Sequence, residues 1–175
     1  MSSIEGIAVA PTSKKIIEKS AIQYLINHCP ESLEQPGPID IERILDVLLF
    51  ESHGFSTKIV QSFLDPTVEA QTNLLERTIE IKESCYNELH QAKRGRFTAG
   101  HEAGHVILHS SQLYSSLIIH KRILPCIGEL PTYRNPEWQA DHFSGALLMP
   151  LLTVLDFIEE LKKRGFNDYN IIKEV

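Results

Sequence analysis

The chain has 175 residues, a length that suits one domain with its own hydrophobic core. Its net charge of −6 argues against a general nucleic-acid binder, because phosphate contacts need a basic surface. It has no run of about 18 apolar residues and no apolar segment at its N-terminus, so neither a membrane-spanning helix nor a signal peptide is predicted. The three cysteines are odd in number and widely spaced, which is typical of a reducing compartment, and we expect a cytoplasmic protein without a membrane partner.

The first part of the chain is predicted to be helical scaffold. We interpret residues 1–12 as a flexible leader and residues 13–54 as two helices joined by a proline-containing loop. Ser13 is the predicted N-cap of the first helix, and Asp40 is the predicted N-cap of the second. A glycine at position 54 can end the second helix.

The sequence period changes between residues 55 and 83, where we predict a small antiparallel sheet. Residues 55–64 have β character, and residues 75–82 alternate in part between apolar and polar side chains. An Asp-Pro pair at 65–66 interrupts the two stretches. The prediction is therefore two or three short strands.

The most informative stretch is a helix predicted at about residues 95–110, which contains His101-Glu102-x-x-His105. Side chains four residues apart lie on one face of a helix, so His101 and His105 can bind one metal ion. Glu102 lies about 100° further round the helix, beside the ion, where it can take a proton from a water activated by zinc. This arrangement is typical of peptide hydrolysis. The alternative is a buried helix with two incidental histidines, because chance alone gives this motif on the order of a few per cent of the time in such a chain.

A zinc hydrolase needs a third protein ligand. His109 follows one turn later, but it lies about 12 Å from His101 along the helix axis and cannot join the same ion. A second helix is predicted from Pro136 to Met149, with Asn135 as its N-cap. Its Glu137 suits a zinc ligand, and Asp141, one turn on, suits an acceptor for the spare N–H of a ligating histidine. The alternative is that Glu137 only complements a helix N-terminus.

Two stretches resemble the ImmA/IrrE family of metallo-endopeptidases: RFTAGHEAGHVILH at 96–109 and EWQADHFSGALLMP at 137–150. The resemblance implies an α+β, zincin-like fold in which a small antiparallel sheet packs on the HExxH helix. It implies one such domain over residues 13–175, with the sheet at 55–83 and catalytic helices at 84–164. The site residues it implies are the metal ligands His101, His105 and Glu137, with Glu102 as general base.

The resemblance also implies an activity and a partner. It implies a zinc-dependent endopeptidase that cleaves a DNA-binding repressor, with Mn²⁺ or another divalent ion as an alternative metal and without direct contact to nucleic acid. The alternative function is a metal-containing module that sequesters a repressor or antitoxin without cleaving it. In zincins an edge strand beside the metal helix binds the substrate as an added strand. Residues 77–82 are our candidate for that strand, and an ordinary strand without a substrate role is the alternative.

Residues 111–134, between the two ligand helices, show little pattern. The candidates for stabilising an oxyanion, which zinc proteases generally need, are Tyr114, His120, Tyr133 and His142. A purely structural metal site would instead need a fourth protein ligand, which His109, His120 or His142 would have to supply.

Overall fold

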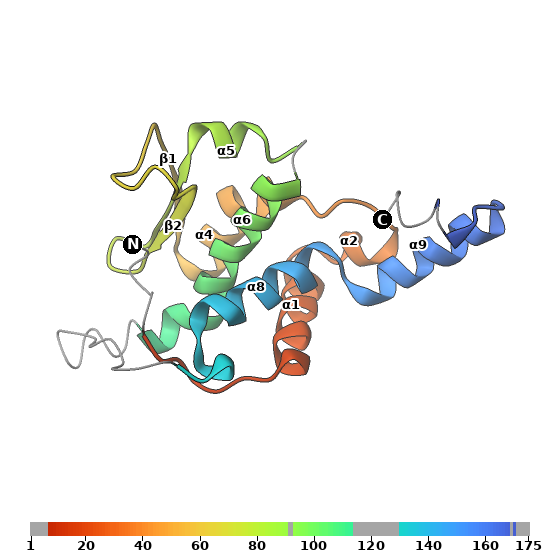
Figure 1. The fold of residues 1–175 in the computed structure, drawn as a ribbon, viewed down its shortest axis with the longest axis horizontal. Coiled ribbons are helices and arrows are strands. Elements are labelled where there is room, and N and C mark those ends of the chain that lie inside the picture. The colour runs from red at the N-terminus through yellow and green to blue at the C-terminus, as the bar shows by residue number, and fades with distance from the viewer. Residues whose placement is uncertain (1–6, 91–92, 114–129, 169, 171–175) are drawn as a thin grey trace.

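The computed structural model describes residues 7–90, 93–113, 130–168 and 170 (Figure 1). A small sheet lies at one end of the molecule and helix α9 (Leu151–Lys163) projects at the other. Between them lie helices α1 (Lys14–His28), α6 (Lys93–Gly104) and α8 (Pro136–Leu148). The chain is therefore a mixed α and β structure, as predicted. In the described parts of the chain, no helix is both long and apolar enough to span a membrane.

The N-terminal helices begin and end where the sequence predicts. The Ser13 side chain accepts a hydrogen bond from the Ile16 N–H at the start of α1, and Asp40 caps the second helix in the same way through the Arg43 N–H. A short helix, α2 (Glu31–Glu34), lies in the loop between them. Gly54 ends the second helix in the left-handed conformation, at φ +70°, a value that glycine adopts without steric cost.

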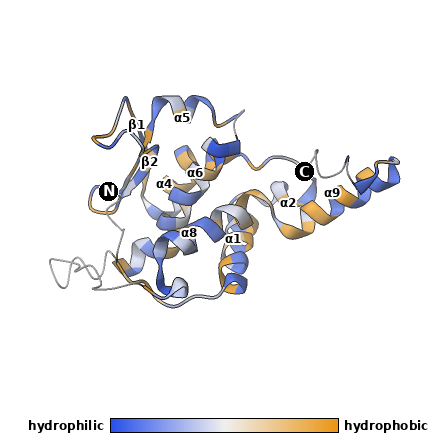
Figure 2. Ribbon diagram, in the orientation of Figure 1, coloured by the Kyte–Doolittle hydropathy of each residue, from blue (hydrophilic) through white to orange (hydrophobic). Residues whose placement is uncertain are grey.

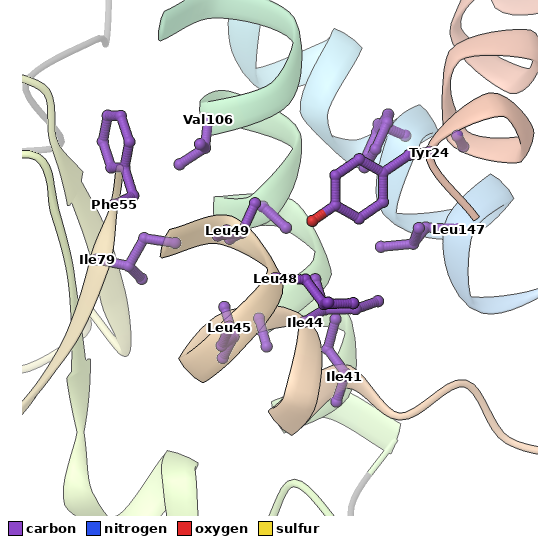
Figure 3. Packing of buried hydrophobic residues seen from close by; sticks show 14 of the residues in the cluster. Tyr24, Ile41, Ile44, Leu45, Leu48, Leu49, Phe55, Ile79, Val106 and Leu147 are labelled. Carbon is purple, nitrogen blue, oxygen red and sulfur yellow. The ribbon is translucent and has the colours of Figure 1, made fainter. Parts of the chain in front are cut away.

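The second helix is not uniform. It passes through three consecutive segments: α3 (Ile41–Arg43), the π-helical η1 (Ile44–Leu48) and α4 (Leu49–His53). Its apolar side chains form the centre of the core with those of α1, α8 and the sheet. Figure 3 shows Tyr24, Leu49 and Leu147 pointing toward one another in this core.

Among the described residues the sheet has three strands, β1 (Ser56–Val60), β2 (Ala70–Asn73) and β3 (Thr78–Lys82), in the order β1-β3-β2. The predicted antiparallel pairing holds for β2 with β3 but is wrong for β1 with β3, which are parallel. The prediction of residues 77–82 as an edge strand is also wrong, because β3 is the central strand. The buried side chains of β3 are Ile79 and Ile81, on one face of the strand. One buried face occurs in central and edge strands alike, so the alternating pattern does not reveal strand order.

Residues 7–12, the part of the predicted leader that the structure describes, have fixed partners. The backbone N–H of Val9 donates to the Arg134 carbonyl and that of Thr12 donates to the Tyr133 carbonyl, both in the 3₁₀ helix η3 (Thr132–Arg134). The Val9 side chain is buried. This segment therefore lies against the chain that leads into α8.

The helix that carries HExxH continues beyond α6 as the π-helical η2 (His105–His109), and α6 packs closely against α8. A Cβ added at Gly104 would lie 3.1 Å from Ala140 Cα and 3.3 Å from its carbonyl oxygen. A Cβ added at Gly100 would lie 2.5 Å from Ser144 Oγ. Both glycines therefore permit the close approach of the two helices, which offsets their cost of about 1 kcal/mol each in a helix.

We expect Gly104→Ala to lower the free energy of unfolding by about 1–2 kcal/mol, because the added methyl group meets backbone atoms of α8 that cannot move independently. Urea unfolding at equilibrium measures the change. Gly145→Ala is the matched control, since a Cβ at Gly145 would meet no atom within 4 Å, and this change should raise stability by about 0.4–1 kcal/mol. Equal stability of the two variants would contradict the close packing of α6 on α8.

Helix α9 follows Pro150 and ends at Lys163, two residues before Gly165, which has a φ of +86°. Much of the α9 ribbon has the colour of hydrophobic residues in Figure 2, and Leu151, Leu152 and Leu155 are exposed.

Candidate metal centre

Two helices bring the three predicted ligands together. α6 and η2 carry His101 and His105, and the first turn of α8 carries Glu137. The two Nε2 atoms lie 2.9 Å apart, and Glu137 Oε2 lies 3.1 Å from His101 Nε2 and 3.5 Å from His105 Nε2. Ligands bound at about 2.0–2.1 Å to a tetrahedral ion lie about 3.3 Å apart. The spacing and chemistry of these donors therefore fit a divalent metal such as zinc.

The position of Glu137 depends on the start of α8. Asn135 is the N-cap, as predicted, and its side chain accepts hydrogen bonds from the N–H groups of Glu137 and Trp138. Pro136 occupies the first helical position, where its missing N–H costs nothing. This capped turn fixes the direction in which the Glu137 side chain leaves the helix.

His101 contacts Asp141, the residue predicted to accept the spare N–H of a ligating histidine. His101 Nδ1 lies 2.8 Å from Asp141 Oδ1, and a carboxylate can only accept, so Nδ1 carries the proton and Nε2 faces Glu137. Burial disfavours the charged ring, but the hydrogen bond to Glu137, the charge of Glu102 and the hydrogen bond to Asp141 outweigh it and raise the pKa of His101 to about 9. Burial likewise opposes ionisation of Glu137, yet the two histidines hold its pKa well below its usual range. The cluster therefore attracts positive charge.

His105 has a different kind of partner. Its Nδ1 lies 3.2 Å from Nδ1 of His109, and His109 Nε2 lies 3.1 Å from Gln139 Oε1. Burial is the main cause that lowers the pKa of His109 to about 4, and the nearby His105 is the second. The His109 ring is therefore neutral. His109 thus lies behind His105, on the side away from the Nε2 atom, which agrees with its exclusion as a ligand of the same ion.

Glu102 is buried next to the cluster and is held by a residue that the sequence analysis did not identify. Thr72 Oγ1, on strand β2, donates a hydrogen bond of 2.6 Å to Glu102 Oε2, and Thr72 is itself buried. The sequence around Thr72 contains no motif, and the strand is only four residues long. No sequence signal could have identified it, because the contact joins residues 30 positions apart.

Two of the four predicted oxyanion candidates, His142 and Tyr133, lie among the described residues. His142 Nδ1 bonds to the Trp138 carbonyl of its own helix, and the Tyr133 side chain is half exposed. Tyr114 and His120 lie outside the described residues. Among the described histidines named as fourth ligands of a structural site, neither His109 nor His142 belongs to the cluster.

A family model described as Peptidase M78, IrrE N-terminal-like domain, matches residues 68–171. The chain belongs to this family. The match covers both helices of the candidate centre and agrees with the resemblance seen in the sequence. The peptidase family and the His/His/Glu cluster together indicate a metal site.

Comparisons with curated proteins and with solved structures say less about this chain than the family match does. No curated protein matches this member of the Peptidase M78 family. A solved structure of a Mycobacterium tuberculosis transcriptional regulator is similar at 15% identity and a TM-score of 0.46, over 83% of this chain. The matched part is 39% of the regulator, so the chain spans well under half of its length.

Proposed function

We propose that this protein is a zinc-dependent endopeptidase with a zincin-like fold, whose metal is held by His101, His105 and Glu137. The observation that carries the proposal is the convergence of these three donor atoms beside a buried Glu102. Two imidazoles and one carboxylate are a ligand set that catalytic zinc uses in peptidases. Manganese or another divalent ion is the alternative on ligand type.

When bound, the metal would polarise the scissile carbonyl and lower the pKa of the attacking water. Glu102 would take the proton of that water and deliver it to the amine nitrogen as the peptide C–N bond breaks. Thr72 donates a hydrogen bond to Oε2 of Glu102, which lowers the basicity of that oxygen and favours Oε1 as the atom that would receive the proton. Asp141 would hold His101 in the tautomer that presents Nε2.

The substrate we propose is a DNA-binding repressor in the cytoplasm, and the support for it is the resemblance to the ImmA/IrrE family. The net charge of −6 supports a protein partner over nucleic acid. The protein would then act on gene expression by removing the repressor, without touching DNA.

Metal-dependent cleavage is the test. We expect co-expression with a DNA-binding repressor encoded beside the gene for this protein to produce new repressor termini, detected by mass spectrometry. With purified proteins, cleavage should stop on addition of 1,10-phenanthroline and return when zinc is restored. An intact repressor that binds tightly to the zinc-loaded chain would instead identify the sequestering module. A zinc-loaded chain that neither binds nor cleaves this repressor would overturn the proposed substrate.

A further inference from the structure

We propose that His109 and Gln139 are positioning residues that fix which ring nitrogen His105 presents to the metal. The inference rests on the proposed function, because it assumes that His105 is a ligand. It assigns a role to two buried polar side chains that do not touch the ligand atoms of the cluster. The relay consists of His105, His109 and Gln139, and its far end contacts the backbone of the N-terminal segment.

The relay begins at Gln139, whose amide orientation is determined by its neighbours. One end of the amide lies 3.0 Å from the Ala10 carbonyl oxygen and 2.8 Å from the Tyr133 carbonyl oxygen. Carbonyl oxygens only accept hydrogen bonds, so the atom facing both of them must be Nε2, the donor. Oε1, which only accepts, therefore faces His109.

The orientation of the Gln139 amide determines which ring nitrogen of His109 carries the proton. Its Nε2 lies 3.1 Å from Gln139 Oε1, so Nε2 must carry a proton to donate. The ring is 0% exposed, and neither of its two ring contacts is a carboxylate, so a doubly protonated, charged ring would be costly. The neutral ring has one proton, at Nε2, and its Nδ1 is consequently an acceptor.

Only one tautomer of His105 is then compatible with its hydrogen bond to His109. Its Nδ1 lies 3.2 Å from the acceptor Nδ1 of His109, so His105 must carry its proton on Nδ1. Its Nε2 is bare and faces the Nε2 of His101 and Oε2 of Glu137. A bare Nε2 is what a metal requires of a neutral imidazole.

The two histidine ligands are thus oriented by different means, and burial explains the difference. Asp141, the partner of His101, has a side chain that is 54% exposed, where a carboxylate keeps its hydration. His105 and Gln139 are 1% and 2% exposed, and an unpaired carboxylate at that depth would be costly. A neutral imidazole and a neutral amide orient the ring without a buried charge.

The far end of the relay is tied to the N-terminal segment. Ala10, whose carbonyl accepts from Gln139, also donates its N–H to Gln112 Oε1 at 3.1 Å. The neighbouring Val9 and Thr12 pair with Arg134 and Tyr133. Residues 7–12 therefore help to hold Gln139 in the orientation on which the relay depends.

The test compares His109→Leu with His109→Asn. Leucine removes the acceptor for His105, whereas the amide oxygen of asparagine stands close to the position of the ring Nδ1 and can replace it. We expect His109→Leu to raise the Kd for zinc by about 10- to 100-fold, as loss of a residue that orients a ligand typically does, and His109→Asn to recover most of that loss. Competition with a chromophoric chelator measures the Kd, and circular dichroism checks that each variant is folded.

Wild-type protein provides a second readout that needs neither a variant nor activity. Long-range ¹H–¹⁵N correlation spectra report which nitrogen of each ring carries its proton. We expect His109 protonated at Nε2 with and without zinc, and His105 protonated at Nδ1 in the zinc-loaded protein. In Gln139→Met the His109 ring should populate both tautomers.

The outcomes separate the relay from the proposed function. A wild type with His109 protonated at Nδ1, or a folded His109→Leu variant that binds zinc as tightly as wild type, overturns the relay and leaves the metal site intact. A wild type that binds no zinc overturns the proposed function, even where its metal-free spectrum has the expected His109 tautomer.

Discussion

Glu102→Gln is expected to lower the rate of repressor cleavage by about 100- to 10,000-fold, the range attributed to general acid–base catalysis. The amide has nearly the same shape and can still accept the hydrogen bond from Thr72, but it cannot take a proton from water. Zinc should remain bound, because Glu102 is not one of the three clustered donors. Single-turnover cleavage measured by mass spectrometry gives the rate, and elemental analysis gives the zinc content.

Glu102→Asp is the matched control for this prediction. It keeps a carboxylate but withdraws it by one methylene group, so we expect a rate between those of wild type and Glu102→Gln. A Glu102→Gln variant that cleaves as fast as wild type would exclude Glu102 as the general base. Unchanged repressor processing by that variant would also argue against the enzymatic function itself.

Glu137→Ala is expected to raise the Kd for zinc by more than about 100-fold, beyond the range typical of residues that only orient a ligand. Two imidazoles would remain, and a catalytic zinc site needs three protein ligands. Competition with a chromophoric chelator measures the affinity, and cleavage should be lost in parallel.

Asp141→Ala is the comparison for Glu137→Ala, because Asp141 lies one turn further along the same helix and contacts His101 Nδ1 rather than the cluster. We expect its Kd for zinc to rise by about 10- to 100-fold. Equal effects of the two substitutions would mean that Glu137 orients a histidine instead of binding the metal. Wild-type affinity in Glu137→Ala would exclude it as a ligand.

Local helical geometry explains what the sequence predicted well. The four-residue spacings of His101 with His105 and of Glu137 with Asp141 place each pair on one helix face, whatever surrounds the helix. The caps at Ser13 and Asn135 also involve residues only two or three positions apart. The tertiary structure adds the neighbour of the HExxH helix, because Gly104 lies close to Ala140 of α8.

Strand order and the contacts around the cluster depended on distant parts of the chain. The pattern of β3 predicted a strand, but an alternating pattern is the same in a central strand as in an edge strand. Thr72 reaches Glu102 across 30 residues, and Gln139 reaches Ala10 across 129. Neither contact follows a regular residue spacing, so neither can be predicted from the sequence.

The sequence by itself determined the family, several helix caps and the side chains that could bind a metal, because each depends on residue type at short spacing. Only the tertiary structure decided which strand lies beside α6 and which groups hold Glu102 and His105. Those partners are chosen by the packing of separate elements, and each buried polar group must find a hydrogen bond wherever packing leaves it.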